Sequence, residues 1–263
     1  MNGLVDIHAH ILPELDDGPG DLEEALAMAR TAVAAGIGTI VSTPHLRSDF
    51  PDVHLHEFAD RCQRMRTALQ SAAIPLRLVC GAEVSLEWAL EASHEELVLA
   101  SIGQNGTDLL IETPTVTVSG LDMHLFQLHK ERFRVTLAHP ERSPDLQSDP
   151  EHVEDLVRQG VLLQVNAGSL LEVRRKSDRG AFARRLCELG LVHALASDGH
   201  RAESWRPVRN LPEGLQVAES LLGCGRAQWM TRAAPQAIVD GTELPDPPAI
   251  SVLPRRKLFG RRR

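Results

Sequence analysis

Two histidines separated by one residue, His8 and His10, are the first side chains in the chain that could do chemistry. Leu4, Val5 and Ile7 precede them and form a short apolar run that is typical of a β-strand. Residues i and i+2 of a strand point to the same side, so both imidazoles are directed at one point where the strand ends. Two neutral imidazoles that converge in this way form half of a site for a divalent metal ion.

Further histidines and carboxylates stand where other apolar runs end. They are His45, Glu83, Glu112, His139, Asp198 and His200, and the loop after the first strand adds the neighbours Asp16 and Asp17, either of which could be a ligand. Together these are five histidines and at least three carboxylates without a thiolate, a set that suits Mn²⁺, Fe²⁺ or Zn²⁺. The set is too large for one ion, so we expect two or three ions that share bridging carboxylates.

Such a centre is what the hydrolysis of a phosphate ester needs. Metal ions about 3.5–4 Å apart can clamp the attacking and leaving oxygens of the displacement. A dianionic phosphate needs further positive charge, which Arg142, beside His139, and Arg206, six residues after His200, could supply as bidentate donors. Arg47 is a weaker third candidate for the same role.

Alternating strands and helices must position these residues. Short apolar runs predict strands at Leu4–Ile7, Thr39–Ser42, Leu76–Cys80, Leu109–Ile111, Arg134–Ala138, Val161–Val165 and Leu191–Ala196. Helical spacing and capping signals predict helices at 21–35, 58–69, 121–128, 149–160, 180–189, 212–222 and 226–239. The alternation indicates an α/β fold with a parallel sheet buried on both faces. Polar residues after nearly every strand, and the lack of a Gly-x-Gly-x-x-Gly motif after the first, favour a barrel over a doubly wound sheet.

Composition excludes several classes of protein. The chain has 263 residues and a net charge of −8, and six basic residues lie among the last nine. Without them 22 basic residues face 36 acidic ones, which argues against nucleic acid as a partner.

We expect one domain over 1–244 and a Pro-rich linker with a disordered basic tail over 245–263. No signal peptide or apolar span of about 18 residues is present, so we expect a cytoplasmic protein. No cysteine has an arginine six positions later, which excludes cysteine-based phosphatases.

The motifs resemble those of the PHP (polymerase and histidinol phosphatase) superfamily, which has H-x-H, T-P-H, A-E, I-E, H-x-E-R and S-D-x-H after successive strands. The fuller runs Asp6–Pro13, Asp16–Gly18, Ser42–His45, Gln164–Ser169 and Ala196–His200 resemble one branch, the CpsB/CapC-type manganese-dependent protein-tyrosine phosphatases, over about residues 4–240. The resemblance implies a distorted, TIM-like (β/α)₇ barrel of the PHP type. It also implies a phosphorylated tyrosine-rich tail of a bacterial tyrosine autokinase, which controls capsule or exopolysaccharide export, as the substrate.

The same resemblance implies three divalent ions, Mn²⁺ with Fe or Zn as alternatives, and assigns their ligands. The first ion would be held by His8, His10, Glu83 and Asp198, the second by Glu83, Glu112 and His139, and the third by Asp17, His45 and His200. Arg142 and Arg206 would bind the phosphate. The chain has no tyrosine, so it cannot be its own phosphotyrosine substrate.

Three other functions remain open or are disfavoured on the sequence. A PHP phosphatase for a small molecule such as histidinol phosphate, and a regulatory PHP barrel without catalysis, are the alternatives. A metal-dependent amidohydrolase is disfavoured because no predicted strand ends in lysine.

The basic tail is either a solvated end or a contact for an acidic membrane or a phosphorylated partner. A second H-x-H, His54 and His56, falls in a loop before a helix and is expected not to bind metal.

Overall fold

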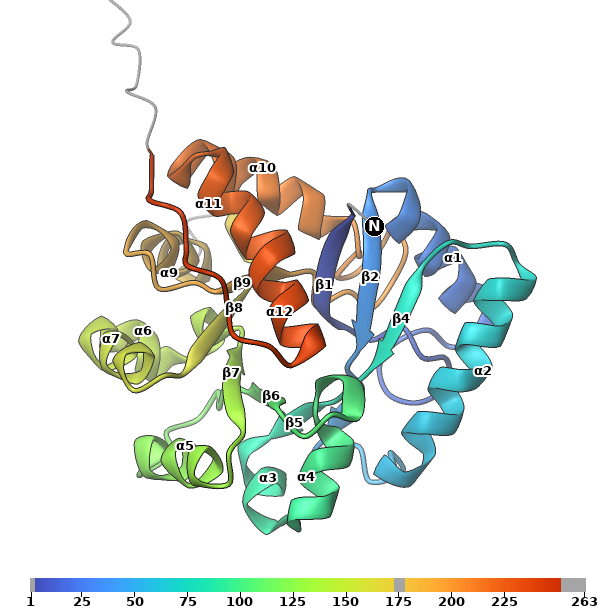
Figure 1. The fold of residues 1–263 in the computed structure, drawn as a ribbon, viewed down its shortest axis with the longest axis horizontal. Coiled ribbons are helices and arrows are strands. Elements are labelled where there is room, and N and C mark those ends of the chain that lie inside the picture. Colours follow the sequence, from blue (N-terminus) through green and yellow to red (C-terminus); the bar gives the residue numbers. More distant parts are fainter. Residues whose placement is uncertain (1–2, 173–177, 252–263) are drawn as a thin grey trace, which may run out of the picture.

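The computed structural model describes residues 3–172 and 178–251 and shows an α/β fold in which strands and helices alternate (Figure 1). Nine strands occur in these ranges, and all of the pairs that they form are parallel. They are β1 (Leu4–Ala9), β2 (Ile37–Ser42), β3 (His45–Leu46), β4 (Arg77–Cys80), β5 (Glu83–Ser85), β6 (Asp108–Glu112), β7 (Arg134–Ala138), β8 (Leu162–Asn166) and β9 (Ala194–Ala196). Each of the seven predicted strands is present, and the last is shorter than predicted.

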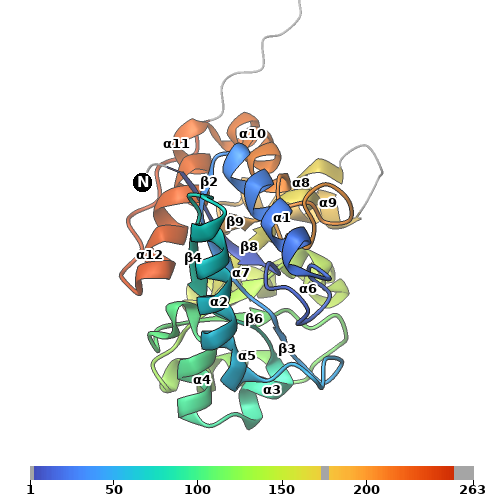
Figure 2. The same cartoon turned by 90° about the vertical axis from the view of Figure 1, so that its right-hand side faces the viewer.

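Helices surround the strands, as two views at right angles show (Figures 1 and 2). They are α1 (Leu22–Ala34), α2 (Phe58–Ser71), α3 (Leu86–Glu91), α4 (His94–Ala100), α5 (Leu121–Lys130), α6 (Pro144–Ser148), α7 (Pro150–Arg158), α8 (Ala167–Leu171), α9 (Asp178–Glu188), α10 (Asn210–Leu222), α11 (Cys224–Gln228) and α12 (Ala234–Asp240). Shorter turns are η1 (Leu55–Glu57), η2 (Ile102–Gln104), η3 (Pro140–Arg142) and the π-helical η5 (Trp229–Ala233). The side chain of Asp21 accepts from the Glu24 N–H, which confirms the predicted cap of the first helix.

The strands form two parallel sheets, and the chain passes between them three times, from β2 to β3, from β3 to β4 and from β4 to β5. One sheet has the order β1-β2-β4 and the other the order β3-β5-β6-β7-β8-β9. Only Thr43 and Pro44 separate β2 from β3, and only Gly81 and Ala82 separate β4 from β5. The free side of β1 bonds to the segment after β9, where the Asp198 N–H donates to the His8 carbonyl at 3.0 Å. Residues from both ends of the chain therefore meet at the carboxyl ends of the strands.

An inner apolar cluster lies between the two sheets. It contains strand residues of both sheets and two residues of α12, namely Val5, Ile7, Val41, Val79, Leu110, Ala138, Leu162, Ala194, Ala196, Ile238 and Val239, with Ile102 beside them. Arg134, at the start of β7, donates to the carbonyl of Thr242 just after α12 at 2.7 Å. Arg134 also pairs with the buried Asp108 at the start of β6, so this ion pair lies at the opposite ends of the strands from the candidate ligands.

His193 lies just before β9 and extends its pairing with β8. Its N–H donates to the Leu163 carbonyl at 2.9 Å, and its Nδ1 accepts from the Leu163 N–H at 3.2 Å, so Nδ1 must stay unprotonated. Burial lowers the pKa of His193 from 6.5 to about 4. As the pH falls, the unfolded chain takes up this proton first, so stability is lost between pH 6.5 and about 4.

The loss attributable to His193 is about 2 kcal/mol in the free energy of unfolding, after allowance for its partial exposure. The His193→Asn variant keeps an acceptor but has no group that titrates here. Its urea midpoint is expected to fall less than that of the wild type between pH 7 and pH 4. Parallel falls in the two proteins would show that the ring does not titrate differently on folding.

The described part of the Pro-rich segment packs against the domain. The indole Nε1 of Trp229 donates to the Pro245 carbonyl at 2.8 Å, and the Ser251 N–H donates to the Leu222 carbonyl at 2.9 Å. The predicted basic tail, from Arg255 onward, lies outside the described residues. Within the two described ranges, no helix combines the length and the apolar character needed to cross a membrane.

Candidate metal centre

The nine residues predicted as metal ligands all lie at the carboxyl ends of the strands. Their possible ligand atoms fall into four overlapping groups, and within each group the atoms lie within 4.8 Å of one another. The groups are His8, Glu83 and His139; His8, His10 and Asp198; His10, Asp17, His45 and His200; and His45, Glu83 and Glu112. Four residues appear in two groups each, so the groups form one continuous cluster.

The first H-x-H pair directs one nitrogen of each ring at this cluster. The two Nε2 atoms of His8 and His10 lie 3.3 Å apart. The other ring nitrogens are already bound, because Nδ1 of His8 donates to Gln164 Oε1 at 2.8 Å and Nδ1 of His10 donates to Asp16 Oδ2 at 2.7 Å. A partner on Nδ1 fixes the tautomer and leaves the Nε2 lone pair for a metal ion.

Glu83 lies at the middle of the cluster and is almost completely buried. Its Oε2 lies 3.1 Å from Nδ1 of His45 and 3.2 Å from Nε2 of His8, and its Oε1 lies 2.7 Å from Nε2 of His139. Burial alone would raise the pKa of Glu83, but the imidazoles of His8 and His45 outweigh it and hold the pKa well below its usual value. A carboxylate that faces ligands on both sides is suited to bridge two cations.

Several buried atoms of the cluster make no hydrogen bond. They are Asp17 Oδ1, His45 Nδ1, Glu83 Oε2 and His139 Nδ1. Buried polar atoms in folded proteins are normally satisfied, and an imidazole nitrogen or a carboxylate oxygen can be satisfied by a metal ion. The residues present therefore fit divalent cations of the Mn²⁺, Fe²⁺ or Zn²⁺ type, and their individual roles as ligands stay predictions.

The two neighbouring aspartates of the first loop have different positions. Asp17 Oδ1 lies 3.1 Å from Nε2 of His200 and 3.7 Å from Nε2 of His45, so it faces the cluster. Asp16 instead accepts from His10 Nδ1 and, at 3.1 Å, from the His45 N–H. A side chain at Gly18 would place its Cβ 2.5 Å from the His10 carbonyl, so the turn after the pair requires glycine. This geometry favours Asp17 as the ligand and Asp16 as the residue that orients His10.

The two arginines predicted to bind phosphate both reach Asp198. Nη1 of Arg142 lies 3.2 Å and Nη1 of Arg206 lies 3.4 Å from Asp198 Oδ2. Both side chains also line a cavity of ≈ 450 Å³ beside the cluster, together with Arg179 and Trp205. The arginines therefore stand between the candidate ligands and an open cavity that could admit a substrate.

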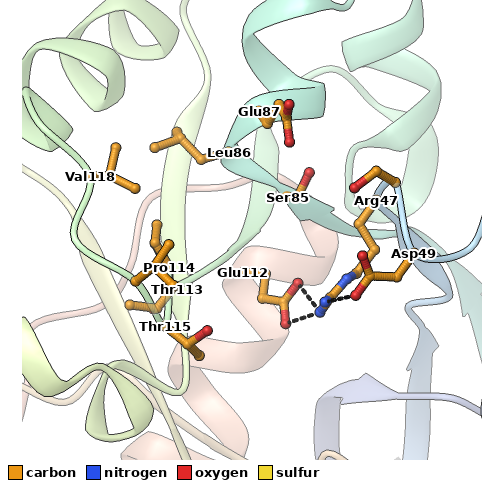
Figure 3. A pocket seen from close by; sticks show the side chains of 12 residues that line it. Arg47, Asp49, Ser85, Leu86, Glu87, Glu112, Thr113, Pro114, Thr115 and Val118 are labelled. Carbon is orange, nitrogen blue, oxygen red and sulfur yellow. Dashed lines mark hydrogen bonds and ion pairs between the residues drawn. The ribbon is translucent and has the colours of Figure 1, made fainter.

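Arg47, the third candidate for phosphate binding, is bound to a predicted ligand. Its Nη1 donates to both carboxylate oxygens of Glu112, at 2.7 and 2.9 Å, and its Nη2 donates to Asp49 (Figure 3). Burial and the nearby charge of Glu83 raise the pKa of Glu112 to about 7, and Arg47 opposes this rise. Arg47 thus stabilises the charged form of Glu112 at the edge of a pocket of ≈ 210 Å³.

Backbone strain accompanies three of these residues. His139, Asp198 and Arg206 have φ values of 38°, 50° and 48°, in the left-handed region that residues other than glycine rarely adopt. Such conformations persist only where the surroundings impose them, and they are concentrated at functional sites. His139 follows β7 directly, Asp198 lies just after β9, and Arg206 lies in the loop before α10.

A chain of buried amides links ligands that the sequence analysis treated separately. Gln164, which accepts from His8, donates through Nε2 to Asn166 Oδ1 at 2.9 Å, and Asn166 donates to Asp198 Oδ2 at 2.7 Å. Both residues stand on one side of β8. The sequence analysis noted the run Gln164–Ser169 only as a motif, although two amides at i and i+2 in an apolar strand are themselves a signal of a buried polar network.

The Gln164→Met variant, of similar volume, is expected to bind metal roughly 10- to 100-fold more weakly than the wild type. It removes the acceptor that orients His8 and leaves Asn166 Oδ1 without a donor. A competition titration of the metal-free protein against a metal-binding dye measures this change. Gln63→Met, an exposed position on α2, is the matched control and is expected to have no effect. Equal affinities in the two variants would mean that Gln164 does not orient a ligand.

The sequence analysis also missed two buried carboxylates that hold the strand ends together beneath the candidate ligands. Asp6 accepts from the Ser197 N–H at 3.0 Å, and burial raises the pKa of Asp6 to about 6. Glu141 accepts from the Asn166 N–H at 2.9 Å and from Ser169 Oγ at 2.8 Å. Burial raises the pKa of Glu141 to about 7. These contacts tie the ends of β1, β7, β8 and β9 together beneath the ligands.

The second H-x-H pair lies apart from this cluster. His54 and His56 stand before and in η1, are exposed, and have ring centroids 5.6 Å apart. They belong to none of the groups of candidate ligands in the part of the chain that the structure describes. The expectation that only the first pair joins the other strand-end residues is therefore consistent with the geometry.

Comparisons with known proteins show the family of this chain. Residues 4–240 match the family model described as capsular polysaccharide synthesis, CpsB/CapC. The tyrosine-protein phosphatase YwqE of Bacillus subtilis is 32% identical over 260 residues, which cover 98% of this chain and 99% of that protein. The tyrosine-protein phosphatase CpsB of Streptococcus pneumoniae is 24% identical over 90% of this chain and 98% of its own length.

Solved structures extend the comparison to three dimensions. One chain from the crystal structures of YwqE from Bacillus subtilis and CpsB from Streptococcus pneumoniae, described as unique metal-dependent tyrosine phosphatases, matches with a TM-score of 0.79 at 30% identity, over 94% of this chain and 99% of that one. A phosphotriesterase from Mycobacterium tuberculosis shares only the fold, with a TM-score of 0.53 at 15% identity, over 90% of this chain and 94% of that one. The match to the family model over nearly the whole domain shows that the chain belongs to the CpsB/CapC family of capsular polysaccharide synthesis proteins.

Proposed function

We propose that this chain is a metal-dependent protein-tyrosine phosphatase that acts on the phosphorylated, tyrosine-rich tail of a bacterial tyrosine kinase controlling capsule or exopolysaccharide synthesis. The observation that carries the proposal is the convergence of Arg142 and Arg206 on Asp198, beside the ligand cluster and at the wall of a cavity. A phosphate placed there would meet the cluster on one side and two guanidinium groups on the other. Membership of the CpsB/CapC family supports the same activity.

We propose three divalent ions, with Mn²⁺ as the natural metal, because the candidate ligands divide into four overlapping groups, two of which share Glu83. The first ion would be held by His8, His10, Glu83 and Asp198, the second by Glu83, Glu112 and His139, and the third by Asp17, His45 and His200. When bound, such cations supply Lewis acidity that stabilises the negative charge developing on the phosphoryl oxygens.

The chain's own residues orient the phosphate ester and keep the site rigid. Arg142 and Arg206 can each donate two hydrogen bonds to the non-bridging oxygens, which fixes phosphorus against the cluster. Water attacks phosphorus in line, the bond from phosphorus to the phenolic oxygen breaks, and the protons of the water remain on the released phosphate. Phenolate, whose conjugate acid has a pKa of about 10, can leave without a strong general acid. The two arginines then stabilise the phosphate product and the transition state that leads to it.

The proposed architecture rests on the bonds between the two sheets, and the proposed location rests on the substrate. The bonds between β1 and the segment after β9 support the proposal that the two sheets together form a distorted (β/α)₇ barrel within one domain, residues 1–244. Residues 245–263 would be a Pro-rich and basic extension. A kinase that uses ATP presents its phosphotyrosines in the cytoplasm, so we place the phosphatase there.

The test is phosphate release by the purified, Mn²⁺-loaded protein. A phosphotyrosine peptide and histidinol phosphate are compared as substrates, each with and without a chelator. The proposal expects faster release from the peptide and loss of that activity with the chelator. Preference for histidinol phosphate would favour a small-molecule phosphatase, no release from either substrate would favour a regulatory barrel, and release that resists the chelator would exclude the metal mechanism.

Replacing either arginine of the phosphate site with lysine is expected to lower kcat/KM for the peptide by roughly 10²-fold. Lysine keeps the charge but loses the planar pair of donors that matches two phosphoryl oxygens. Arg142→Lys and Arg206→Lys are assayed beside Arg185→Lys, a substitution on α9 outside the cavity. The metal content of all three is expected to equal that of the wild type. A loss of metal in step with activity would assign the arginines to the ligand network instead.

A further inference from the structure

The loop between the last candidate ligand and α10 presents an aromatic ring at the mouth of the site. Trp205 is 53% exposed and is one of the few large apolar side chains that the described part of the chain leaves in solvent. It lines the same cavity as Arg142, Arg206 and Asp198. The chain has only six phenylalanines, three tryptophans and no tyrosine, so few side chains could place an aromatic ring at this mouth.

The position of this ring is fixed by the backbone of the site. Arg201 and Pro207 pair as an isolated parallel bridge, and the His200 N–H donates to the Arg206 carbonyl at 2.8 Å. Nη1 of Arg201 also donates to the Asp17 carbonyl at 3.0 Å, which connects this loop to the loop after β1. The loop is therefore held at both ends by residues of the metal centre, and its aromatic side chain has a defined place.

The indole of Trp205 also contacts an imidazole and a guanidinium, the two kinds of group that a bound phosphate ester would meet. Its centroid lies 4.8 Å from that of the His200 imidazole at an angle of 64°, an edge-on contact, and the Arg206 guanidinium lies 4.6 Å from the indole centroid. Trp205 thus ends a row of rings that runs through His200, His10 and His45 to Phe50. More than half of the residue is still exposed and can receive another ring.

We propose that Trp205 receives the phenyl ring of phosphotyrosine and makes the site prefer aryl over alkyl phosphate monoesters. The inference rests on the proposed phosphatase function and specifies its substrate. With the phosphate between Arg142 and Arg206, the phenyl ring of the ester begins one oxygen away from phosphorus, beside the indole. Pairs of aromatic rings prefer offset or edge-on contacts at these separations and are stabilised beyond the area they bury. Phosphoserine and phosphothreonine have no ring to place there.

The first test compares two peptides of one sequence, carrying phosphotyrosine or phosphoserine, with the Mn²⁺-loaded protein. In Trp205→Ala, kcat/KM for the phosphotyrosine peptide is expected to fall roughly 3- to 10-fold because KM rises. The kcat/KM of the same variant for the phosphoserine peptide is expected to fall less than about 2-fold. Trp205→Phe is expected to restore most of the loss. Phe126→Ala, an exposed aromatic on α5, is the matched control and changes neither.

An equal loss on both peptides would overturn the inference, because Trp205 would then only position Arg206 or His200. No loss on either peptide would overturn it as well. The metal content of each variant is measured to exclude damage to the centre. An exposed substitution of this kind is expected to leave the melting temperature close to that of the wild type.

A binding experiment separates this inference from the proposed function. Calorimetry with the metal-loaded protein compares phenylphosphonate with methylphosphonate, neither of which is hydrolysed. Trp205→Ala is expected to weaken only phenylphosphonate, again roughly 3- to 10-fold. A wild type that releases no phosphate from phosphotyrosine would refute the phosphatase function, whereas the ratio of the two phosphonate affinities would still decide whether Trp205 binds an aryl group. Equal changes for both phosphonates would refute the role of Trp205 alone.

Discussion

Replacing Glu83 with glutamine is expected to lower kcat for a phosphotyrosine peptide by roughly 10³-fold or more, the scale of metal-assisted charge stabilisation. The carboxylate oxygens of Glu83 lie between 2.7 and 3.4 Å from nitrogens of four imidazoles. Glutamine keeps the volume but places an amide donor where a lone pair is needed, and it removes the charge that two cations would share. Elemental analysis after Mn²⁺ loading and gel filtration is expected to show at least one ion fewer per chain.

The matched control for this variant is Glu95→Gln. Glu95 lies in the first turn of α4 and is exposed, so the same chemical change there is expected to alter neither metal content nor rate. Both proteins are compared with the wild type over a range of Mn²⁺ concentrations, which separates weaker binding from a slower loaded enzyme. If E83Q retains the full metal content and rate of the wild type, Glu83 does not bridge.

The two H-x-H pairs are expected to respond oppositely to the same substitution. His8→Ala removes a ring whose Nε2 lies 3.2 Å from Glu83 and 3.5 Å from Asp198, and it is expected to lose metal and roughly 10²- to 10³-fold in activity. His54→Ala removes an exposed ring before η1 and is expected to change neither.

Parallel measurements of metal content and of phosphate release decide between the pairs. Since the spacing is identical in the sequence, the comparison isolates the effect of position in the fold. Similar losses in both variants would mean that the exposed pair also holds an ion and that the strand end does not determine the site.

The sequence analysis could group the candidate metal ligands because parallel strands bring their carboxyl ends to one edge. His45, Glu112 and Asp198 could be placed near His8 without knowledge of the order of the strands, since every strand that precedes a helix ends on the same side. The alternation of apolar runs and helices was strong enough to identify all seven principal strands. The histidines and carboxylates at the strand ends then indicated metal binding.

The sequence did not reveal the short strands β3 and β5. Each follows a longer strand after only two residues, and two or three residues cannot show a periodicity of their own. Their pairing, His45 opposite Glu83, nevertheless places two candidate ligands side by side. The left-handed backbone of His139 and Asp198 was equally beyond prediction, because their N–H groups bond to Gln164 and His8 on other strands. The pairing of Arg47 with Glu112 depends on contacts 65 residues apart.

His8 and His10 are translated 190 residues before Asp198 and His200, to which the structure joins them at the end of β9. At about 5–20 residues per second, the nascent chain carries the first pair for roughly 10 to 40 s before the matching residues are made. During that interval the ribosome-bound chain has only part of the ligand cluster. Full loading of the proposed centre would therefore follow translation of residue 200, because Asp198 and His200 are among its predicted ligands.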